Sequence, residues 1–365
     1  MTRRRALAAT AGLVLGLAAS SPFAPAQAAD DTIKVGILHS LSGTMAISET
    51  TLKDTILFLI DEQNKKGGVL GKKLALEADD DACDPKQARS IAEKIGSSKI
   101  PFVAGHFCSS SSIPASEAYA DANVLQITPA STNPLFTERK LWNVARVCGR
   151  DDQQGLVAAD YIVKNFKGKN VAILNDKTTY GKGLADETKK ALNKAGFQEK
   201  MFESYNKGDK DFNSIVSRLK RDNIDLVYVG GYHQEAGLIL RQMRDQGLQT
   251  ILMAGDAMND KEFASITGPA AEGTLFTFGP DPRNKPTAKA IVEKFKAKNI
   301  DPEGYTLYTY AAMQVWTQAV AKAGTTDAKK VMETIKALHS LTLFGAAMNI
   351  LLEIVAGWEI GRAHV

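Results

Sequence analysis

The sequence predicts an α/β protein with parallel sheets, on three observations. Short segments rich in Val, Ile and Leu alternate with amphipathic segments of about ten to fifteen residues, which is the pattern of βαβ units. This alternation runs to about residue 128 and starts again near residue 155, which indicates two similar lobes. The loops of chemical interest each follow a predicted strand, and open parallel sheets bind ligands beyond the carboxyl ends of their strands.

The first half of the chain alternates strongly. The expected strands are 33–38, 74–78, 101–105 and 124–127, and the expected helices are 51–65, 85–97 and 111–122. The glycine-rich segment Gly67–Lys73 resembles a phosphate-binding loop, but such a loop joins a strand to a helix. Here a helix precedes the segment and a strand follows it, so we interpret it as a turn.

The second half repeats the rhythm. The expected helices are 155–166, 183–195, 211–221 and 234–246, and the expected strands are 170–174, 200–204, 225–229 and 250–253. Tyr180–Gly183 lacks the full glycine fingerprint of a nucleotide site. We interpret it as a loop that caps a helix.

The N-terminus is typical of an export signal. Arg3–Arg5 supply positive charge, residues 6–19 are apolar, and Ala26–Ala28 form a small-x-small cleavage site. The apolar stretch is shorter than the roughly 20 residues that a membrane span needs. We therefore expect cleavage after Ala28 and a periplasmic protein.

Length and charge limit the classes of function. A chain of 365 residues suggests two domains. Removal of residues 1–28 takes away three Arg and no acid, which lowers the formal charge from +4 to +1. A nearly neutral chain without a basic run is poorly suited to nucleic acid, so we expect no such partner.

Neither a metal site nor a catalytic nucleophile stands out in the sequence. The five histidines are His39, His106, His233, His339 and His364. None lies at metal-binding spacing from a cysteine or another histidine, and Ser109–Ser112 contain no Gly-x-Ser-x-Gly elbow. We expect no cofactor and no enzymatic activity.

Three cysteines leave one without a partner. In an oxidising compartment Cys83 and Cys108 can close a loop of about 25 residues, worth roughly 3 kcal/mol in the chain-entropy model. Such a bridge fixes the loop that presents Ser109 at a helix start, where free N–H groups suit an anion. Cys148 is the odd one and is expected to be a buried thiol.

Four motifs carry a resemblance to a known family. They are residues 80–88, 105–111, 127–132 and 230–233. They resemble the exported branched-chain amino-acid-binding proteins of ABC transporters, the leucine/isoleucine/valine-binding type, over about residues 66–335. The resemblance implies the type I periplasmic binding protein fold, with two Rossmann-like lobes, parallel sheets, hinge segments and a ligand held between the lobes.

The resemblance also implies roles for single residues. Ser109 and Thr132 are expected to hold the ligand α-carboxylate, and the Ala130 carbonyl to accept from the α-ammonium. Asp256 matches the acidic residue of the family that pairs with the ammonium. A buried zwitterion needs both charges matched, and charge-assisted hydrogen bonds supply this.

Aromatic side chains complete the expected site. Tyr180, Tyr232 and Tyr305 are expected to line the side-chain pocket or to close over it. The segment 36–54, however, resembles the urea- and short-chain-amide-binding branch of the same fold. It places Ser48 where the amino-acid branch usually has an aromatic residue near the pocket wall, so Ser48 and the neighbouring glutamate can contact an amide instead.

The end of the chain departs from the family pattern. After about Ala337 we expect no further strand and no final crossing segment. Residues 341–357 form an apolar run, but its length and Glu353 argue against a membrane anchor. Residues 359–365 resemble a translated sequencing adapter, so we expect residues 338–365 not to be native coding sequence.

These observations predict a domain organisation and a function. Residues 1–28 are a signal peptide, 29–149 with about 279–337 form lobe 1, 150–278 form lobe 2, and 338–365 are an aberrant tail. The expected function is capture of branched-chain or other aliphatic amino acids and delivery to the membrane permease of an ABC importer, by a monomer. Ser109, Thr132 and Asp256 favour this over a urea- or amide-binding protein, and a ligand sensor is the third possibility.

Overall fold

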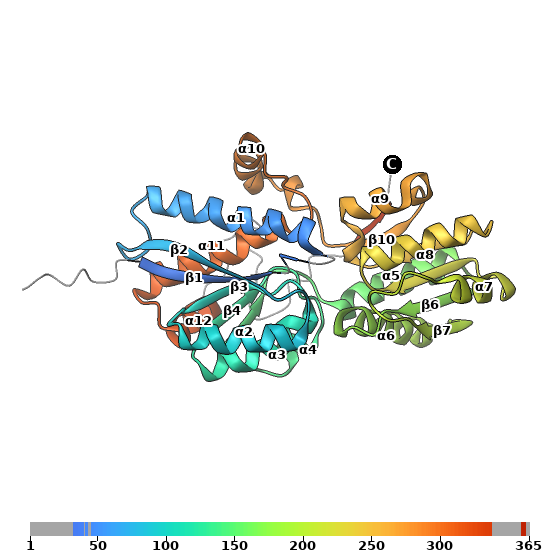
Figure 1. Ribbon diagram of the computed structural model, residues 1–365, viewed down its shortest axis with the longest axis horizontal. Coiled ribbons are helices and arrows are strands. Elements are labelled where there is room, and N and C mark those ends of the chain that lie inside the picture. Colours follow the sequence, from blue (N-terminus) through green and yellow to red (C-terminus); the bar gives the residue numbers. More distant parts are fainter. Residues whose placement is uncertain (1–31, 40, 43–44, 338–358, 363–365) are drawn as a thin grey trace, which may run out of the picture. The chain divides into compact units, whose positions relative to one another are not determined.

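The structure is a computed structural model that describes residues 32–39, 41–42, 45–337 and 359–362 (Figure 1). The expected signal peptide lies outside the described residues, as do most of the tail and the expected cleavage site. No helix in the described ranges is both long enough and apolar enough to cross a membrane.

The first sheet has five parallel strands in the order β2-β1-β3-β4-β5. The strands are β1 (Thr32–His39), β2 (Lys73–Asp80), β3 (Phe102–Gly105), β4 (Leu125–Thr128) and β5 (Val144–Arg146). The helices that accompany it are α1 (Ala46–Lys65), α2 (Pro85–Ser97), α3 (Ser109–Asp121) and α4 (Leu135–Glu138), together with the later α11 (Thr306–Ala323) and α12 (Ala328–Ala337).

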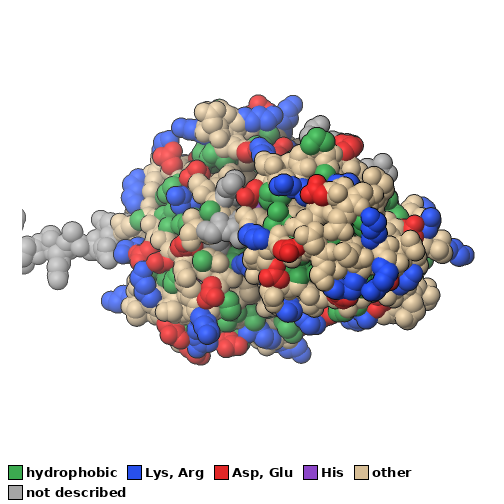
Figure 2. Space-filling model, turned by 45° about the vertical axis from the view of Figure 1, so that its right-hand side comes forward, with side chains coloured by type: hydrophobic (Ala, Val, Ile, Leu, Met, Phe, Trp, Pro, Cys, Tyr) green, Lys and Arg blue, Asp and Glu red, His purple; other side chains and the backbone are tan. Residues whose placement is uncertain are grey.

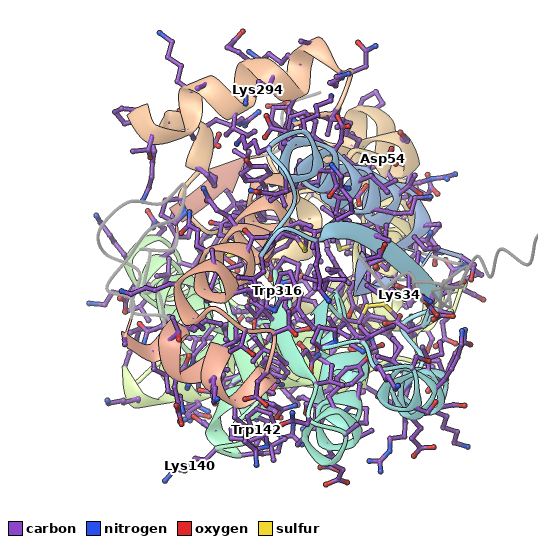
Figure 3. All side chains as sticks on the ribbon, turned by 90° about the vertical axis from the view of Figure 1, so that its left-hand side faces the viewer. Lys34, Asp54, Lys140, Trp142, Lys294 and Trp316 are labelled. Atoms are coloured by element: carbon purple, nitrogen blue, oxygen red, sulfur yellow. A yellow bond between two sulfur atoms is a disulfide. The ribbon has the colours of Figure 1, made fainter. Side chains whose placement is uncertain are left out.

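Helices cover both faces of this first sheet (Figure 1). α1, α11 and α12 pack on one face, where Trp316 of α11 stacks on Phe102 of β3 with ring centroids 4.8 Å apart. Figure 3 shows Trp316 in the interior of this layer. α2 and α3 pack on the other face around the buried Val103 and Tyr119. The first sheet is thus buried between two layers, as parallel sheets require.

The second sheet has six strands in the order β11-β10-β9-β8-β6-β7. The strands are β6 (Val171–Asn175), β7 (Met201–Ser204), β8 (Leu226–Gly230), β9 (Ile251–Ala254), β10 (Leu275–Phe278) and β11 (Glu359–Arg362). The helical segments around it are α5 (Asp151–Asn165), α6 (Thr179–Lys194), α7 (Asn213–Arg221), α8 (His233–Asp245), η2 (Asp256–Met258), α9 (Lys261–Thr267) and η3 (Gly268–Ala271). All pairings are parallel except that of β10 with β11.

The chain passes between the two sheets after β5 and again after β10. After β10 it forms η4 (Pro282–Asn284), η5 (Pro286–Ala288) and α10 (Lys289–Ala297) before it reaches α11. α10 packs through Phe295 on Phe58 of α1, with ring centroids 5.0 Å apart. Acidic and basic side chains are interspersed over the face shown in Figure 2, consistent with the near-neutral charge.

The prediction of two lobes with parallel sheets is confirmed, with local differences. α3 begins at Ser109 instead of residue 111, and α6 begins at Thr179 instead of residue 183. The expectation that the tail holds no strand is wrong for Glu359–Arg362, which pair with β10 as β11. The reason is general: an edge strand presents unpaired N–H and C=O groups that an extended segment can satisfy.

Candidate functional site

Five of the residues expected to bind ligand line one small pocket. They are Ser109, Ala130, Tyr180, Tyr232 and Asp256, which share the pocket with Phe107 and Ala257. All follow the carboxyl ends of parallel strands, from β3 and β4 of the first sheet and from β6, β8 and β9 of the second. The pocket is small, with a volume of about 10 Å³, and residues of both lobes line it.

Asp256 lies in this pocket with its carboxylate almost fully buried, and three side chains donate to it. Tyr305 donates to Oδ2 at 2.5 Å, while Tyr180 and Gln154 each donate to Oδ1 at 2.9 Å. Burial raises the pKa of Asp256, and these hydrogen bonds act in the opposite direction by stabilising the charged form. Tyr305 therefore touches the site through Asp256, although it is not one of the residues that line the small pocket.

The sequence interpretation missed Gln154 and Asp151. The Gln154 amide oxygen accepts from the Asp256 backbone N–H at 2.8 Å and from the Thr277 hydroxyl at 2.6 Å. Its amide nitrogen donates to Asp151 Oδ1 at 3.0 Å as well as to Asp256. Gln154 thus holds the two carboxyl groups and the start of η2 in place.

Asp151 is a second buried carboxyl group beside Asp256. Its side chain has no exposed surface, and burial together with the Asp256 charge raises its pKa well above the ordinary value. Asp151 is the first residue of α5, and helix starts are commonly acidic because of the helix dipole. An aspartate at that position therefore did not indicate a site. The prediction that the helix begins at residue 155 also left Asp151 and Gln154 outside it.

Hydroxyl groups also lie at the site, beyond the ends of β3 and β4. Ser109 Oγ is buried and accepts from the Asn133 backbone N–H at 3.3 Å. Thr132 Oγ1 is also buried, close to Asp151, and makes no hydrogen bond at normal distance among the described residues. The first turn of α3 adds N–H groups that lack an intrahelical partner and the positive end of the helix dipole.

Aromatic rings form the walls of the pocket. The rings of Tyr180 and Tyr232 have centroids 5.1 Å apart, and Phe107 meets Tyr305 edge-on at 5.5 Å. Ser48 lies in the first turn of α1, and its side chain is outside the described part of the structure. Its expected contact with ligand therefore stays a prediction.

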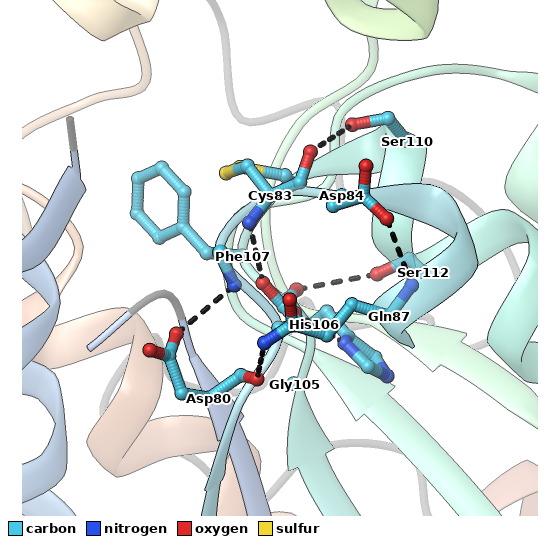
Figure 4. A network of polar contacts seen from close by, with 12 residues as sticks. Asp80, Cys83, Asp84, Gln87, Gly105, His106, Phe107, Ser110 and Ser112 are labelled. Carbon is cyan, nitrogen blue, oxygen red and sulfur yellow. Dashed lines mark hydrogen bonds and ion pairs between the residues drawn. A yellow bond between two sulfur atoms is a disulfide. The ribbon is translucent and has the colours of Figure 1, made fainter. Parts of the chain in front are cut away.

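Cys83 and Cys108 form a disulfide directly ahead of α3, with Cα atoms 5.6 Å apart. Figure 4 shows the polar network around it. The Cys83 N–H donates to Asp81 Oδ1 at 2.8 Å, and Asp81 Oδ2 lies 2.5 Å from His106 Nδ1. Ser110 Oγ donates to the Cys83 carbonyl at 3.5 Å. These contacts anchor the start of α3, which presents Ser109.

The third cysteine plays a different part. Cys148 is a free thiol and is buried. Burial raises the pKa of its thiol to about 12, so the nucleophilic thiolate is scarce at neutral pH. A buried, inert thiol is what the sequence led us to expect.

Residues 32–352 match the model of the family described as periplasmic binding protein. The Leu/Ile/Val-binding protein homolog 1 of Brucella suis is 47% identical over 322 residues, which are 88% of this chain and 86% of the relative. An amino acid binding protein of Pseudomonas aeruginosa is 44% identical over 335 residues, 91% and 90% of the two chains.

Solved structures agree with these relatives. The leucine binding protein LivK of Thermotoga maritima superposes with a TM-score of 0.84 at 28% identity, covering 91% of this chain and 95% of that one. LivJ of Streptococcus pneumoniae, solved with isoleucine, gives a TM-score of 0.78 at 23% identity over 91% and 100% of the two chains, and supports the fold alone.

Proposed function

The chain belongs to the periplasmic binding protein family, and we propose that it captures branched-chain or other aliphatic amino acids for an ABC importer. The observation that carries this proposal is that one pocket combines groups that suit a cation with groups that suit an anion. A buried carboxylate, Asp256, lines this pocket together with the buried Ser109 hydroxyl at the N-terminus of α3. An α-amino acid is a zwitterion and can match both kinds of group at once.

The ammonium group of the ligand fits Asp256. A buried ammonium requires a charged or strongly polar partner, and the Asp256 carboxylate is held for this by Tyr180, Gln154 and Tyr305. The Ala130 carbonyl is the second expected acceptor. Charge-assisted hydrogen bonds of this kind contribute about 1.5–3 kcal/mol each.

The carboxylate group of the ligand fits the hydroxyl groups. Ser109 begins α3, and Thr132 carries a buried hydroxyl beside Asp151. A ligand carboxylate accepts from both hydroxyls and from the N–H groups of the first helical turn. The Cys83–Cys108 bridge fixes this turn before the ligand arrives, which lowers the entropy cost of binding.

The remainder of the ligand contacts the aromatic walls. Tyr180, Tyr232 and Phe107 offer apolar ring surface, which suits an aliphatic side chain. Because the ligand touches residues of both lobes, it binds the closed form better than the open form and shifts the population toward closure. In this proposal lobe 1 comprises residues 29–149 and 279–337, and lobe 2 comprises residues 150–278.

The setting of the protein follows from this function. The signal at residues 1–28 directs it to the periplasm, where the disulfide persists, and the closed form delivers its ligand to a membrane permease. The family is a solute-binding fold and not an enzyme family. We therefore assign the protein no catalytic role, and a monomer suffices for this task.

A short-chain amide such as urea is the second candidate ligand. The observation that favours it is Glu49, a fully buried carboxyl group in the first turn of α1, next to Ser48. A carboxylate accepts hydrogen bonds from an amide N–H group, and a neutral amide has no carboxylate for it to repel. Such a ligand does not need Asp256 to be charged.

Calorimetric titration with leucine, isoleucine, valine, urea and acetamide separates the two candidates. We expect saturable binding of at least one aliphatic amino acid at one equivalent and none of urea or acetamide. Binding of urea alone, without a response to any amino acid, would contradict the proposal. Ser109→Ala, Thr132→Val and a Ser97→Ala control on the exposed end of α2 show whether the binding occurs at this pocket.

A further inference from the structure

His233, Asp260 and Glu262 form a cluster of potential metal ligands beside the amino-acid pocket. One donor atom of each lies within 4.8 Å of those of the other two. His233 begins α8 after strand β8, Asp260 caps α9 after strand β9, and Glu262 is in the first turn of α9. The His233 side chain is fully buried, while the two acids are partly exposed.

The two imidazole nitrogens of His233 have different surroundings. Nε2 lies 2.7 Å from Glu262 Oε2, and Gln234 donates to the same carboxylate at 3.2 Å. Nδ1 is buried and has no hydrogen-bond partner among the described residues. When Nε2 carries the proton and donates to Glu262, Nδ1 carries the lone pair.

The Nδ1 lone pair faces Asp260. Asp260 Oδ1 accepts from the Glu262 backbone N–H at 2.8 Å and so caps α9, while Oδ2 lies 3.9 Å from His233 Nδ1. Zinc bonds of about 2.0–2.2 Å in tetrahedral geometry place neighbouring ligand atoms about 3.4 Å apart. The observed separation is thus close to the one that a bound ion imposes.

We propose that His233 Nδ1 and Asp260 bind a divalent transition metal ion of the zinc type, while Glu262 orients the imidazole through its contact with Nε2. The hydrogen bond of the imidazole to a carboxylate is the arrangement that orients histidine ligands in metal sites, and imidazole with carboxylate suits zinc. Asp260 also borders a cavity of about 430 Å³, through which an ion and its remaining water ligands reach the cluster.

The metal site shares its segments with the amino-acid pocket. His233 directly follows Tyr232, and Asp260 lies four residues after Asp256. A bound ion joins these two segments and restricts their movement. If it changes amino-acid affinity by some factor, the amino acid changes metal affinity by the same factor. Metal binding to the protein without amino acid can be measured whichever amino acid the pocket takes.

The test is a zinc titration of the protein, purified without a polyhistidine tag and stripped with a chelator, against a chromophoric zinc indicator. We expect one equivalent to bind at pH 7.5, with weaker binding at pH 5.5, because metal ligands must be deprotonated. His233→Gln is expected to weaken binding at least about 100-fold, and Glu262→Gln about 10- to 100-fold. Glu93→Gln, which removes an exposed acid from α2, is the control and leaves the affinity unchanged.

Two outcomes overturn the proposal. One is no saturable binding to the unsubstituted protein, and the other is equal affinity in the protein and in His233→Gln. Circular dichroism establishes that each variant is folded. Should His233→Gln fail to fold, Asp260→Asn decides, because asparagine still caps a helix and we expect it to lower zinc affinity at least about tenfold.

Discussion

Replacing Asp256 by asparagine removes one negative charge from the pocket and keeps the size of the side chain. The amide oxygen can still accept from Tyr180 or Tyr305, which donate to the carboxylate at 2.9 and 2.5 Å in the native protein. Asp256→Asn is therefore a gentler change than Asp256→Ala, which leaves these buried hydroxyls and the Gln154 amide without their acceptor.

The expected loss of affinity follows from the surroundings of Asp256. Truncating one partner of a buried charge pair costs about 2–5 kcal/mol, largely because the other charge stays buried and unpaired. Asp151 is a second buried carboxyl group linked to Asp256 through Gln154, and its oxygens remain as acceptors that offset part of that cost. We therefore expect about 2–3 kcal/mol, which corresponds to about 30- to 150-fold weaker binding.

Calorimetry with the preferred amino acid at pH 7.5 measures this loss. Asp222→Asn, which removes a partly exposed acid in the same lobe, is the matched control and should bind normally. Burial raises the pKa of Asp256, and binding of the ligand ammonium requires the ionised form of this carboxyl group. Native affinity should therefore begin to fall, as the pH is lowered, at a higher pH than an ordinary aspartate would give, and that of Asp256→Asn should change less. An affinity within about threefold of native, in a folded Asp256→Asn protein, would refute the charge match.

Three further predictions concern stability, measured by urea unfolding. Replacing Cys83 and Cys108 together by serine removes a bridge across a sequence separation of 25 and should cost about 3–4 kcal/mol; equal midpoints for the variant and the oxidised native protein would contradict this. Burial raises the pKa of Asp176 to about 6, so the group contributes stability at low pH that is lost as the pH rises through 6. The free energy of unfolding of Asp176→Asn should exceed that of the native protein by about 3 kcal/mol at pH 7.5 and by less than about 1 kcal/mol at pH 4. A difference that does not change with pH would argue against this pKa. Gly230→Ala places a Cβ 2.1 Å from the Gly181 carbonyl oxygen and should lower stability by about 1–3 kcal/mol, whereas native stability would mean that α6 shifts away from β8 freely.

The regular part of the fold was predictable because its signals are local. Each predicted strand from 33–38 to 250–253 matches an observed strand to within about two residues, since apolar runs bounded by turns mark buried strands without any tertiary information. The rule that ligands bind at strand carboxyl ends then predicts that the candidate residues lie close together. Ser109, Ala130, Tyr180, Tyr232 and Asp256 accordingly line one pocket.

The support of the site was not predictable, because it depends on contacts between distant parts of the chain. Gln154 donates a hydrogen bond to Asp256, which is 102 positions away in the sequence. Nothing in the sequence around either residue indicates that contact. The cluster at His233 was missed for the same reason, since its acids lie on another helix. The chain beyond β9 carries weaker periodicity, so β10 and the helices from α9 to α12 were not assigned.

The packing of α11 against the first sheet has a consequence for the order in which the chain folds. Trp316 completes the layer over Phe102, so one face of that sheet is covered by α1 alone until a late part of the polypeptide has been synthesised. Strands β6 to β10 and their helices, by contrast, come from one continuous stretch. The second lobe can therefore form as an early autonomous unit, while the first must hold its strands together through high-contact-order pairing until the C-terminal helices arrive.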